Sequence, residues 1–125
     1  MKVESADLEW LADVFKALSH PHRLRIFLRL AASCPAHSRH GQPPESPLGV
    51  GDLGEDLDLA PSTLSHHIKE LRQAGIIRAA RQGQSIRCWV DPEVIEALSG
   101  FIHSAAHGQP CCILRRSRHH RHYRR

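Results

Sequence analysis

The segment Ala60–Gly75, which reads APSTLSHHIKELRQAG, constrains the fold more than any other part of this sequence. Leu64, Ile68 and Leu71 recur at i, i+4 and i+7, the spacing of one helix face. The proline near its start suits the first turn of a helix, and the final glycine suits a helix end. The preceding residues, Gly49–Leu59, have the pattern of a second short helix. Two helices joined by a turn of about four residues predict a helix-turn-helix, which sets its second helix into the DNA major groove.

The hydrophobic period changes after this segment. Ile76–Ala80 and Ser85–Val90 are short runs with strand-like composition, and Gly83 lies between them. A glycine between two such runs is typical of a β-hairpin. We therefore predict a two-stranded β wing, whose tip would reach the backbone or minor groove of DNA.

Three further helices are predicted. The first spans about Ser5–Leu18, the second begins at Pro21, and the last opens at Asp91-Pro92. For the second helix we expect a buried stripe of Leu24, Phe27, Leu28 and Ala31.

The first and last helices carry more apolar surface than one small core needs. In the first helix this surplus includes Trp10 and Val14. Spare apolar faces of this kind predict a homodimer seam. The predicted fold class is thus mainly α with a two-stranded β wing, a winged helix-turn-helix. A two-fold dimer would hold its recognition helices ~34 Å apart on a pseudo-palindromic operator.

Together these segments resemble the ArsR/SmtB family of winged-helix repressors. That family shows an ALxxPxRLxIL-like helix, a DL…L segment and a TxSxHLxxLxxAGLI-like recognition helix. The matching stretches here are Ala17–Phe27, Asp52–Leu57 and Thr63–Ile77, and the resemblance covers roughly residues 7–106. It implies a homodimeric transcriptional repressor that binds double-stranded operator DNA and releases it when a metal, metalloid or other inducer binds.

The length of 125 residues predicts one structured domain. We assign residues 1–107 to the DNA-binding and dimerisation domain, with a mobile loop insertion at 33–47, where prolines and glycine exclude helix. Residues 108–125 hold a cysteine pair and an Arg/His-rich tail that we predict to be disordered. No apolar run reaches transmembrane length and no signal-peptide pattern is present, so we expect a cytoplasmic protein with no membrane partner.

Positive charge is concentrated on the predicted DNA face. Residues 59–90 contain five Lys and Arg against one acidic residue, and residues 115–125 contain six Arg and no acidic residue. Residues 1–114 as a whole hold 11 Lys and Arg against 13 Asp and Glu. This distribution suits neutralisation of phosphates by one face and the tail.

The predicted DNA contacts lie on the outer face of the recognition helix and at the wing tip. The hydroxyls, imidazoles and cations there can bond to base edges or phosphates. The set is Ser62, Thr63, Ser65, His66, His67, Lys69, Arg81, Gln82 and Gln84. The family resemblance places the first four at positions that meet bases and phosphates. His67 lies beside the apolar stripe, so a semi-buried structural histidine is the alternative for it.

Two inducer sites known from the family are incomplete here. Many metal-sensing members carry ELCVCDL before the recognition helix, whereas this chain reads PLGVGDL, with Gly49 and Gly51 in place of the thiols. A second site uses Asp-x-His…His-x-x-His/Glu on the last helix. The corresponding positions here hold Asp91, Glu93, Ser104 and His107, and the serine breaks the set. Asp91 has the alternative role of capping the last helix.

The cysteines offer a third possibility. Cys111 and Cys112 are adjacent, so both can bind a thiophilic ion. As(III) prefers about three thiolates, and the third could come from Cys88 or Cys34. Cys88 alternates with apolar strand residues and is alternatively a small core side chain. Cys34 begins a Cys-x-x-His-x-x-His run inside the predicted loop. The predicted metal ligands are therefore Cys111, Cys112, Cys88 and Cys34, with no obligatory cofactor and with As(III) or another thiophilic ion as inducer.

Two alternatives keep the DNA-binding function. The same thiols could form a disulfide and act as a redox switch, or the chain could be an inducer-independent regulator. An enzyme is not predicted, because the sequence contains no nucleophile elbow, phosphate-binding glycine loop or HExxH motif.

Overall fold

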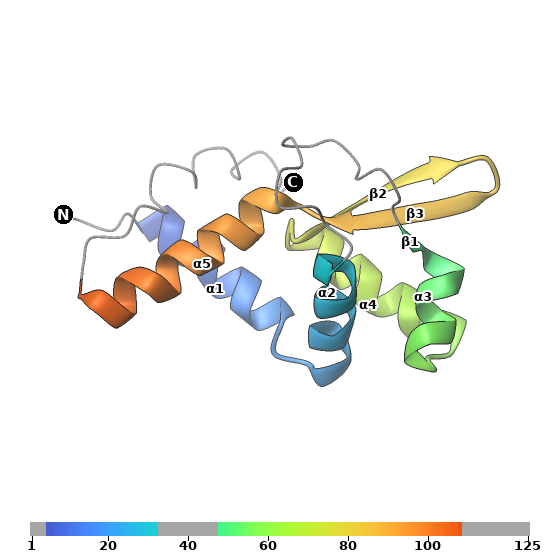
Figure 1. The fold of residues 1–125 in the computed structure, drawn as a ribbon, viewed down its shortest axis with the longest axis horizontal. Helices are drawn as coiled ribbons and strands as arrows, with labels where there is room; N and C mark the ends of the chain where they lie inside the picture. The colour runs from blue at the N-terminus through green and yellow to red at the C-terminus, as the bar shows by residue number, and fades with distance from the viewer. Residues whose placement is uncertain (1–4, 33–47, 109–125) are drawn as a thin grey trace.

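The computed structural model describes residues 5–32 and 48–108 of the chain (Figure 1). The predicted loop at 33–47 and most of the predicted tail lie outside the described residues, as do Cys34, Cys111 and Cys112. The elements in chain order are α1 (Ser5–Ala17), α2 (Pro21–Ala32), β1 (Leu48–Gly49), α3 (Val50–Leu57), α4 (Pro61–Gln73), β2 (Ile77–Gln82), β3 (Ser85–Val90) and α5 (Pro92–His107). The prediction of a mainly α fold with a β wing is confirmed. None of the described helices is long and apolar enough to cross a membrane.

The sheet is antiparallel and has the order β1-β3-β2. The predicted hairpin is formed by β2 and β3, with a register that runs from Ile77 opposite Val90 to Gln82 opposite Ser85. Gly83 turns the chain between them with φ 65°, a conformation that a residue with Cβ rarely adopts. β1 was not predicted. It pairs with the root of β3, where Leu48 lies opposite Cys88.

The hydrophobic core lies where the helices meet the root of the hairpin. Its fully buried members include Leu53 of α3, Leu71 of α4 and Val94 of α5. The stripe predicted for α2 is wrong in part. Phe27 and Ala31 pack against the core as predicted, whereas Leu24 and Leu28 are 43% and 64% exposed. Ile26 and Leu30, also four residues apart, take the core side instead.

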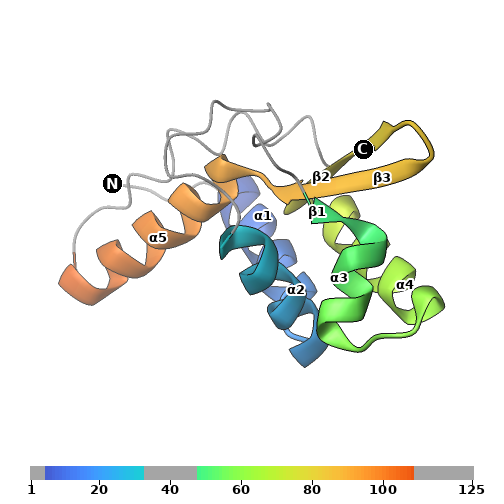
Figure 2. The same ribbon diagram turned by 45° about the vertical axis from the view of Figure 1, so that its right-hand side comes forward.

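α1 and α5 lie beside each other at the end of the molecule away from the hairpin tip (Figures 1 and 2). The rings of Phe15 and Phe101 join the two helices, with centroids 5.7 Å apart. The surplus apolar surface predicted for Trp10 and Val14 is not there, because both side chains are buried in the core. The large apolar side chains left exposed on these two helices are Leu8, Phe15 and Ile102.

Candidate nucleic-acid interface

The turn between α3 and α4 is set by local backbone geometry. α3 ends at Leu57, and the next residue, Asp58, adopts the left-handed conformation with φ 53° and ψ 48°. The next amide, that of Leu59, donates to the carbonyl of Gly54 at 3.0 Å. Ala60 then precedes α4 in an extended conformation, and Pro61 occupies its first turn. This is the compact helix-turn-helix expected from the sequence.

Close packing of the two helices depends on a glycine. A Cβ atom built on Gly54 would lie 3.0 Å from Cδ2 of Leu64, closer than real Cβ atoms normally come to a neighbour. The core stripe of α4 is as predicted, since Leu64, Ile68 and Leu71 are all buried. The packing of these buried side chains fixes the orientation of α4 and so determines which of its side chains face outward.

Five of the predicted contact residues on α4 are exposed together. They are Ser62, Thr63, Ser65, His66 and Lys69. Short hydroxyl side chains allow the helix backbone to approach a groove closely, and the imidazole and ammonium groups supply longer donors. The side of α4 that the core leaves open therefore has the chemistry of a DNA-reading surface.

The wing supplies a second exposed group. Arg81, Gln82 and Gln84 surround the glycine turn and are all exposed. The hairpin extends beyond the helices in both ribbon views (Figures 1 and 2). One cation and two amides at such a tip can contact phosphates or minor-groove edges.

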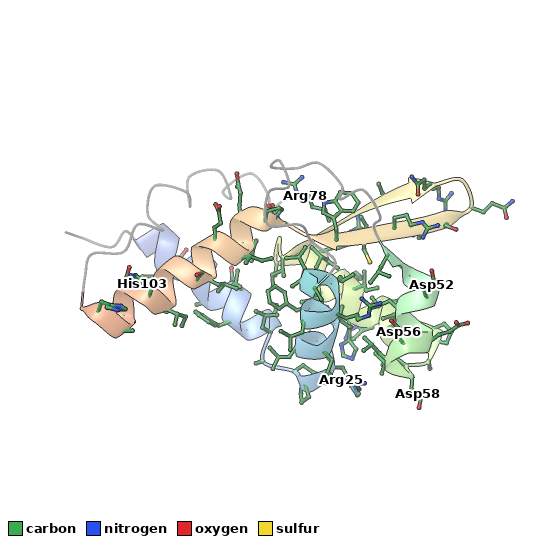
Figure 3. The ribbon with its side chains drawn as sticks, viewed as in Figure 1. Arg25, Asp52, Asp56, Asp58, Arg78 and His103 are labelled. Atoms are coloured by element: carbon green, nitrogen blue, oxygen red, sulfur yellow. The ribbon has the colours of Figure 1, made fainter. Side chains whose placement is uncertain are left out.

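Within the helix-turn-helix, acidic residues are concentrated on α3 and its end, and α4 carries a single one, the partly exposed Glu70. Asp52, Asp56 and Asp58 lie along α3 and the turn that follows it (Figure 3). Asp56 accepts a hydrogen bond from Nε of Arg29 at 2.8 Å, which joins α3 to α2. Both side chains are partly exposed, so this ion pair contributes about 1 kcal/mol or less. The charge pattern separates α3 from the more basic face of α4.

His67 does not belong to the reading surface. Its side chain is only 5% exposed, and its Nδ1 accepts a hydrogen bond from Nε of Arg23 at 3.2 Å. Burial lowers the pKa of His67, and the nearby His20, Arg23, His22 and His66 lower it further. The predicted DNA contact is therefore wrong for this residue, and the alternative of a structural histidine is confirmed.

The carboxylate of Asp91 accepts two hydrogen bonds that stabilise the fold. One carboxylate oxygen accepts from the amide of Glu93 at 3.0 Å and so caps α5. The other accepts from Nε of Arg78 at 3.2 Å, where β2 leaves the core (Figure 3). Asp91 is 1% exposed, so the capping role is confirmed. At the far end of α5, His107 Nδ1 lies 2.8 Å from the carbonyl oxygen of His103.

Cys88 is a core residue. It is fully buried, and its sulfur lies 3.8 Å from the carbonyl oxygen of Leu48. Burial raises the pKa of the Cys88 thiol to about 11. Metals bind the thiolate, and burial in the core opposes its formation, so the position of Cys88 does not support its prediction as the third ligand. Its alternative role as a small core side chain is confirmed.

The described part of the chain contains no group of three His, Cys, Asp or Glu side chains arranged to hold a metal ion. Gly49, where many relatives of the family have a thiol, lies against the guanidinium of Arg87. A Cβ atom at Gly49 would come within 3.1 Å of Nη1 of Arg87. The prediction of a thiol site at Cys34, Cys111 and Cys112 concerns residues outside the described ranges.

Sequence reasoning missed the partners of His67. Arg23 of α2 donates to His67 of α4 and also to the carbonyl of Ala17 at 3.4 Å. Nδ1 of His20 accepts a hydrogen bond from the His22 amide at 3.1 Å and so caps α2. The sequence signal for this cluster was the pair His20 and His22 on either side of Pro21, where α2 begins.

Comparison with known proteins supports the helix-turn-helix assignment. A family profile described as a helix-turn-helix domain matches residues 18–79. The transcriptional regulator NmtR of Mycobacterium tuberculosis is 32% identical over 98 residues, which cover 78% of this chain and 71% of NmtR. The arsenic resistance transcriptional regulator ArsR1 of Pseudomonas putida is 32% identical over 89 residues, which cover 71% of this chain and 60% of ArsR1.

A solved structure shows the same fold. It is a homodimeric winged helix-turn-helix DNA-binding domain from Mycobacterium bovis, which superposes with a TM-score of 0.59 at 23% sequence identity. The match covers 85% of this chain and 90% of that domain.

Proposed function

Because this chain belongs to the ArsR/SmtB family of winged helix-turn-helix transcriptional regulators, we propose that it is a homodimeric repressor of transcription. It binds a pseudo-palindromic operator through α4 and the β2–β3 hairpin and releases the operator when an inducer binds. Since the family consists of transcriptional regulators, the chain is not an enzyme.

The observation that carries the DNA-binding proposal is the division of α4 into two faces. Leu64, Ile68 and Leu71 anchor one face in the core, which leaves the serine, threonine, histidine and lysine side chains of the other face exposed. A groove-reading helix needs this arrangement, because the scaffold must present its polar side chains rigidly. The exposed wing tip adds a second contact on the same protomer.

The homodimer proposal rests on the apolar side chains exposed on α1 and α5. Leu8, Phe15 and Ile102 are 49%, 41% and 57% exposed. A two-fold interface would cover each of them with the same face of a second copy. The similar domain from Mycobacterium bovis is itself homodimeric, which supports this assembly. Analytical ultracentrifugation should therefore give twice the chain mass of 14.1 kDa.

The DNA-binding proposal is tested with a duplex selected from a random-sequence library by the full chain itself. Replacing Ser65 and His66 with alanine should weaken binding to that duplex by ~10-fold or more, since a good base contact contributes ~1–3 kcal/mol. Fluorescence anisotropy at fixed salt measures the dissociation constant.

The matched control is the double replacement of Ser99 and His103 with alanine. It removes the same two side-chain types from exposed positions on α5. Because these positions flank Ile102 of the proposed dimer face, ultracentrifugation must first give the dimer mass for the control, and its affinity should then equal that of the wild-type chain. An S65A/H66A variant that binds the duplex as tightly as the wild-type chain would remove α4 from the proposed reading surface.

For the inducer, we propose As(III) or another thiophilic ion bound by Cys111 and Cys112, with Cys34 as the remaining thiol. The arsenic resistance regulator ArsR1 is among the similar proteins, which supports this class of inducer. A ligand that favours one dimer geometry lowers DNA affinity by its coupling free energy, typically ~1–3 kcal/mol. Binding should weaken in acid, because the thiols must lose their protons.

Operator release should be titrated against arsenite, zinc, cadmium and hydrogen peroxide. Release by arsenite with the added mass of arsenic supports the metalloid proposal. Release by peroxide alone, with the loss of two hydrogen atoms that marks a disulfide, would instead indicate a redox switch. Full DNA affinity under every condition would indicate an inducer-independent regulator.

A further inference from the structure

Histidines from two parts of the chain converge where the start of α2 meets α4. The ring of His67 lies 4.6 Å from that of His20, 5.7 Å from that of His22 and 5.6 Å from that of His66, measured between ring centroids. His20 and His22 are themselves stacked at 5.3 Å. We call His20, His22, His67 and Arg23 the imidazole junction.

The hydrogen bond from Arg23 to His67 defines which ring nitrogen carries the proton. Nδ1 of His67 accepts from Nε of Arg23 at 3.2 Å, so the proton of the neutral ring is on Nε2. A second proton would have to sit on Nδ1, facing the guanidinium. Protonation therefore removes this α2–α4 hydrogen bond and places two cations in contact.

The cap of α2 depends on a neutral imidazole in the same way. Nδ1 of His20 accepts from the amide of His22 at 3.1 Å, which satisfies one of the free N–H groups at the start of the helix. Protonation of His20 at Nδ1 would abolish this cap and add a positive charge at the positive end of the helix dipole. Two adjacent contacts thus both require an unprotonated Nδ1.

The surroundings of His67 oppose its protonation. Arg23 and His22 face it from α2, His20 from the preceding turn, and His66 from α4 itself. α1 contributes the carbonyl of Ala17, which accepts from Arg23 at 3.4 Å and carries no net charge. Burial and these four groups all lower the pKa of His67.

We propose that the imidazole junction positions α4 against α2 only while its histidines are neutral, so that acidification weakens DNA binding. The proposal deepens the proposed function and depends on it, because it requires α4 to be the DNA-reading helix. It assigns Arg23, His20 and His67 as positioning residues, which act through α4 and not by touching DNA.

The sign follows from proton linkage. A histidine whose pKa is lowered on folding binds fewer protons in the folded state than in the unfolded state. Its contribution to stability is complete above the unfolded value of about 6.5 and is lost as the pH falls through the lowered folded value. Positive charge gained on the exposed face of α4 would act in the opposite direction, because cations beside DNA phosphates strengthen binding.

The test compares the wild-type full chain with His67→Asn, which keeps an acceptor near the Nδ1 position and cannot be protonated. His103→Asn is the control, since it removes an exposed histidine outside the junction. The free energy of unfolding without DNA and the dissociation constant for the selected duplex are each measured from about pH 7.5 to about pH 5.5. NMR titration of the imidazole nitrogens reports the tautomer and pKa of His67.

We expect the unfolding equilibrium constant to rise more steeply in acid for the wild-type chain than for His67→Asn. At about pH 5.5 the acid-induced rise of this constant should be up to about tenfold larger in the wild-type chain than in His67→Asn. About tenfold is the limit for one histidine that stays neutral in the folded state. The acid-induced loss of DNA affinity should be at least about threefold larger in the wild-type chain than in the variant. His103→Asn should behave like the wild type.

Two results would overturn the proposal. One is a His67 that titrates with an ordinary pKa and unfolding curves with the same pH dependence in both chains. The other is an affinity that increases in acid, which would show that positive charge gained beside the DNA dominates. Acid-dependent unfolding in a chain that binds no duplex at any pH would support the junction but overturn the proposed function and the DNA part of this proposal.

A second variant keeps the proposal testable if His67→Asn does not fold. Arg23→Gln retains a donor toward His67 but removes the guanidinium charge. It should raise the pKa of His67 and flatten the pH dependence of unfolding. An unchanged NMR titration of His67 in Arg23→Gln would contradict the role of the arginine.

Discussion

Replacing Asp91 with alanine should lower the free energy of unfolding by about 2–4 kcal/mol. The carboxylate is 1% exposed and accepts two hydrogen bonds, from the amide of Glu93 at 3.0 Å and from Nε of Arg78 at 3.2 Å. Loss of a helix cap costs ~1 kcal/mol. Loss of a hydrogen bond between charged groups costs ~1.5–3 kcal/mol, and this pair lies mostly away from solvent.

A substitution by asparagine at the same position separates the two contributions. Asparagine caps helices about as well as aspartate does, because its side-chain oxygen accepts from the same amide, but it carries no charge. Asp91→Asn should therefore keep the bond from the Glu93 amide and lose only the ion pair with Arg78. We expect Asp91→Ala to be about 1 kcal/mol less stable than Asp91→Asn.

Urea denaturation followed by circular dichroism measures both variants. The protein concentration must be held constant, because the stability of a dimer depends on it. Asp58→Asn is the control, since Asp58 is exposed and asparagine tolerates its left-handed backbone. Equal stability of Asp91→Ala and Asp91→Asn would refute the capping contribution. Stability within about 0.5 kcal/mol of wild type for both would refute the whole account of this residue.

Two further predictions concern the cysteines. Cys88 should resist alkylation in the folded chain at about pH 7.5, because a thiol with a pKa of about 11 is less than about one part in a thousand thiolate there, and it should react once urea unfolds the protein. Labelling should increase as the pH rises toward that pKa; peptide mass spectrometry measures it, and equal labelling of folded and unfolded chains would contradict the burial of this thiol. Replacing Cys111 and Cys112 with serine should leave DNA binding intact and abolish release by arsenite in the anisotropy assay. A double variant that still releases the duplex normally would exclude these two thiols as the sensor.

Local sequence signals were sufficient for the helices and the hairpin. Leu64, Ile68 and Leu71 define one stripe on α4, and the glycine turn at Gly83 defines the hairpin. α2 shows where such signals fail. Its apolar residues include the i, i+4 pairs Leu24/Leu28, Ile26/Leu30 and Phe27/Ala31, and hydrophobic period alone cannot decide which of these pairs enter the core. The pair Ile26 and Leu30 is buried through tertiary packing that the period does not encode.

The features that escaped prediction depend on contacts between distant parts of the chain. β1 has only two residues and forms because β3, about 40 residues later, offers a free edge. The bond between Arg23 and His67 joins residues 44 positions apart. The helical spacing of His67 placed it at the border of the stripe, where a buried and an exposed orientation are both compatible with the pattern. The fold was thus more predictable than the exact set of residues that form the DNA-binding surface.

The two-faced construction of α4 also bears on how such a regulator can change over time. Ser62, Thr63, Ser65 and His66 occupy positions that the core does not use. Substitutions there should alter which operator is preferred at little cost to folding, because exposed positions usually tolerate exchange within about 0.5 kcal/mol. A duplicated gene could thus acquire a new target through a few neighbouring codons. His67 is the exception on this helix, since any replacement must also satisfy an arginine from α2.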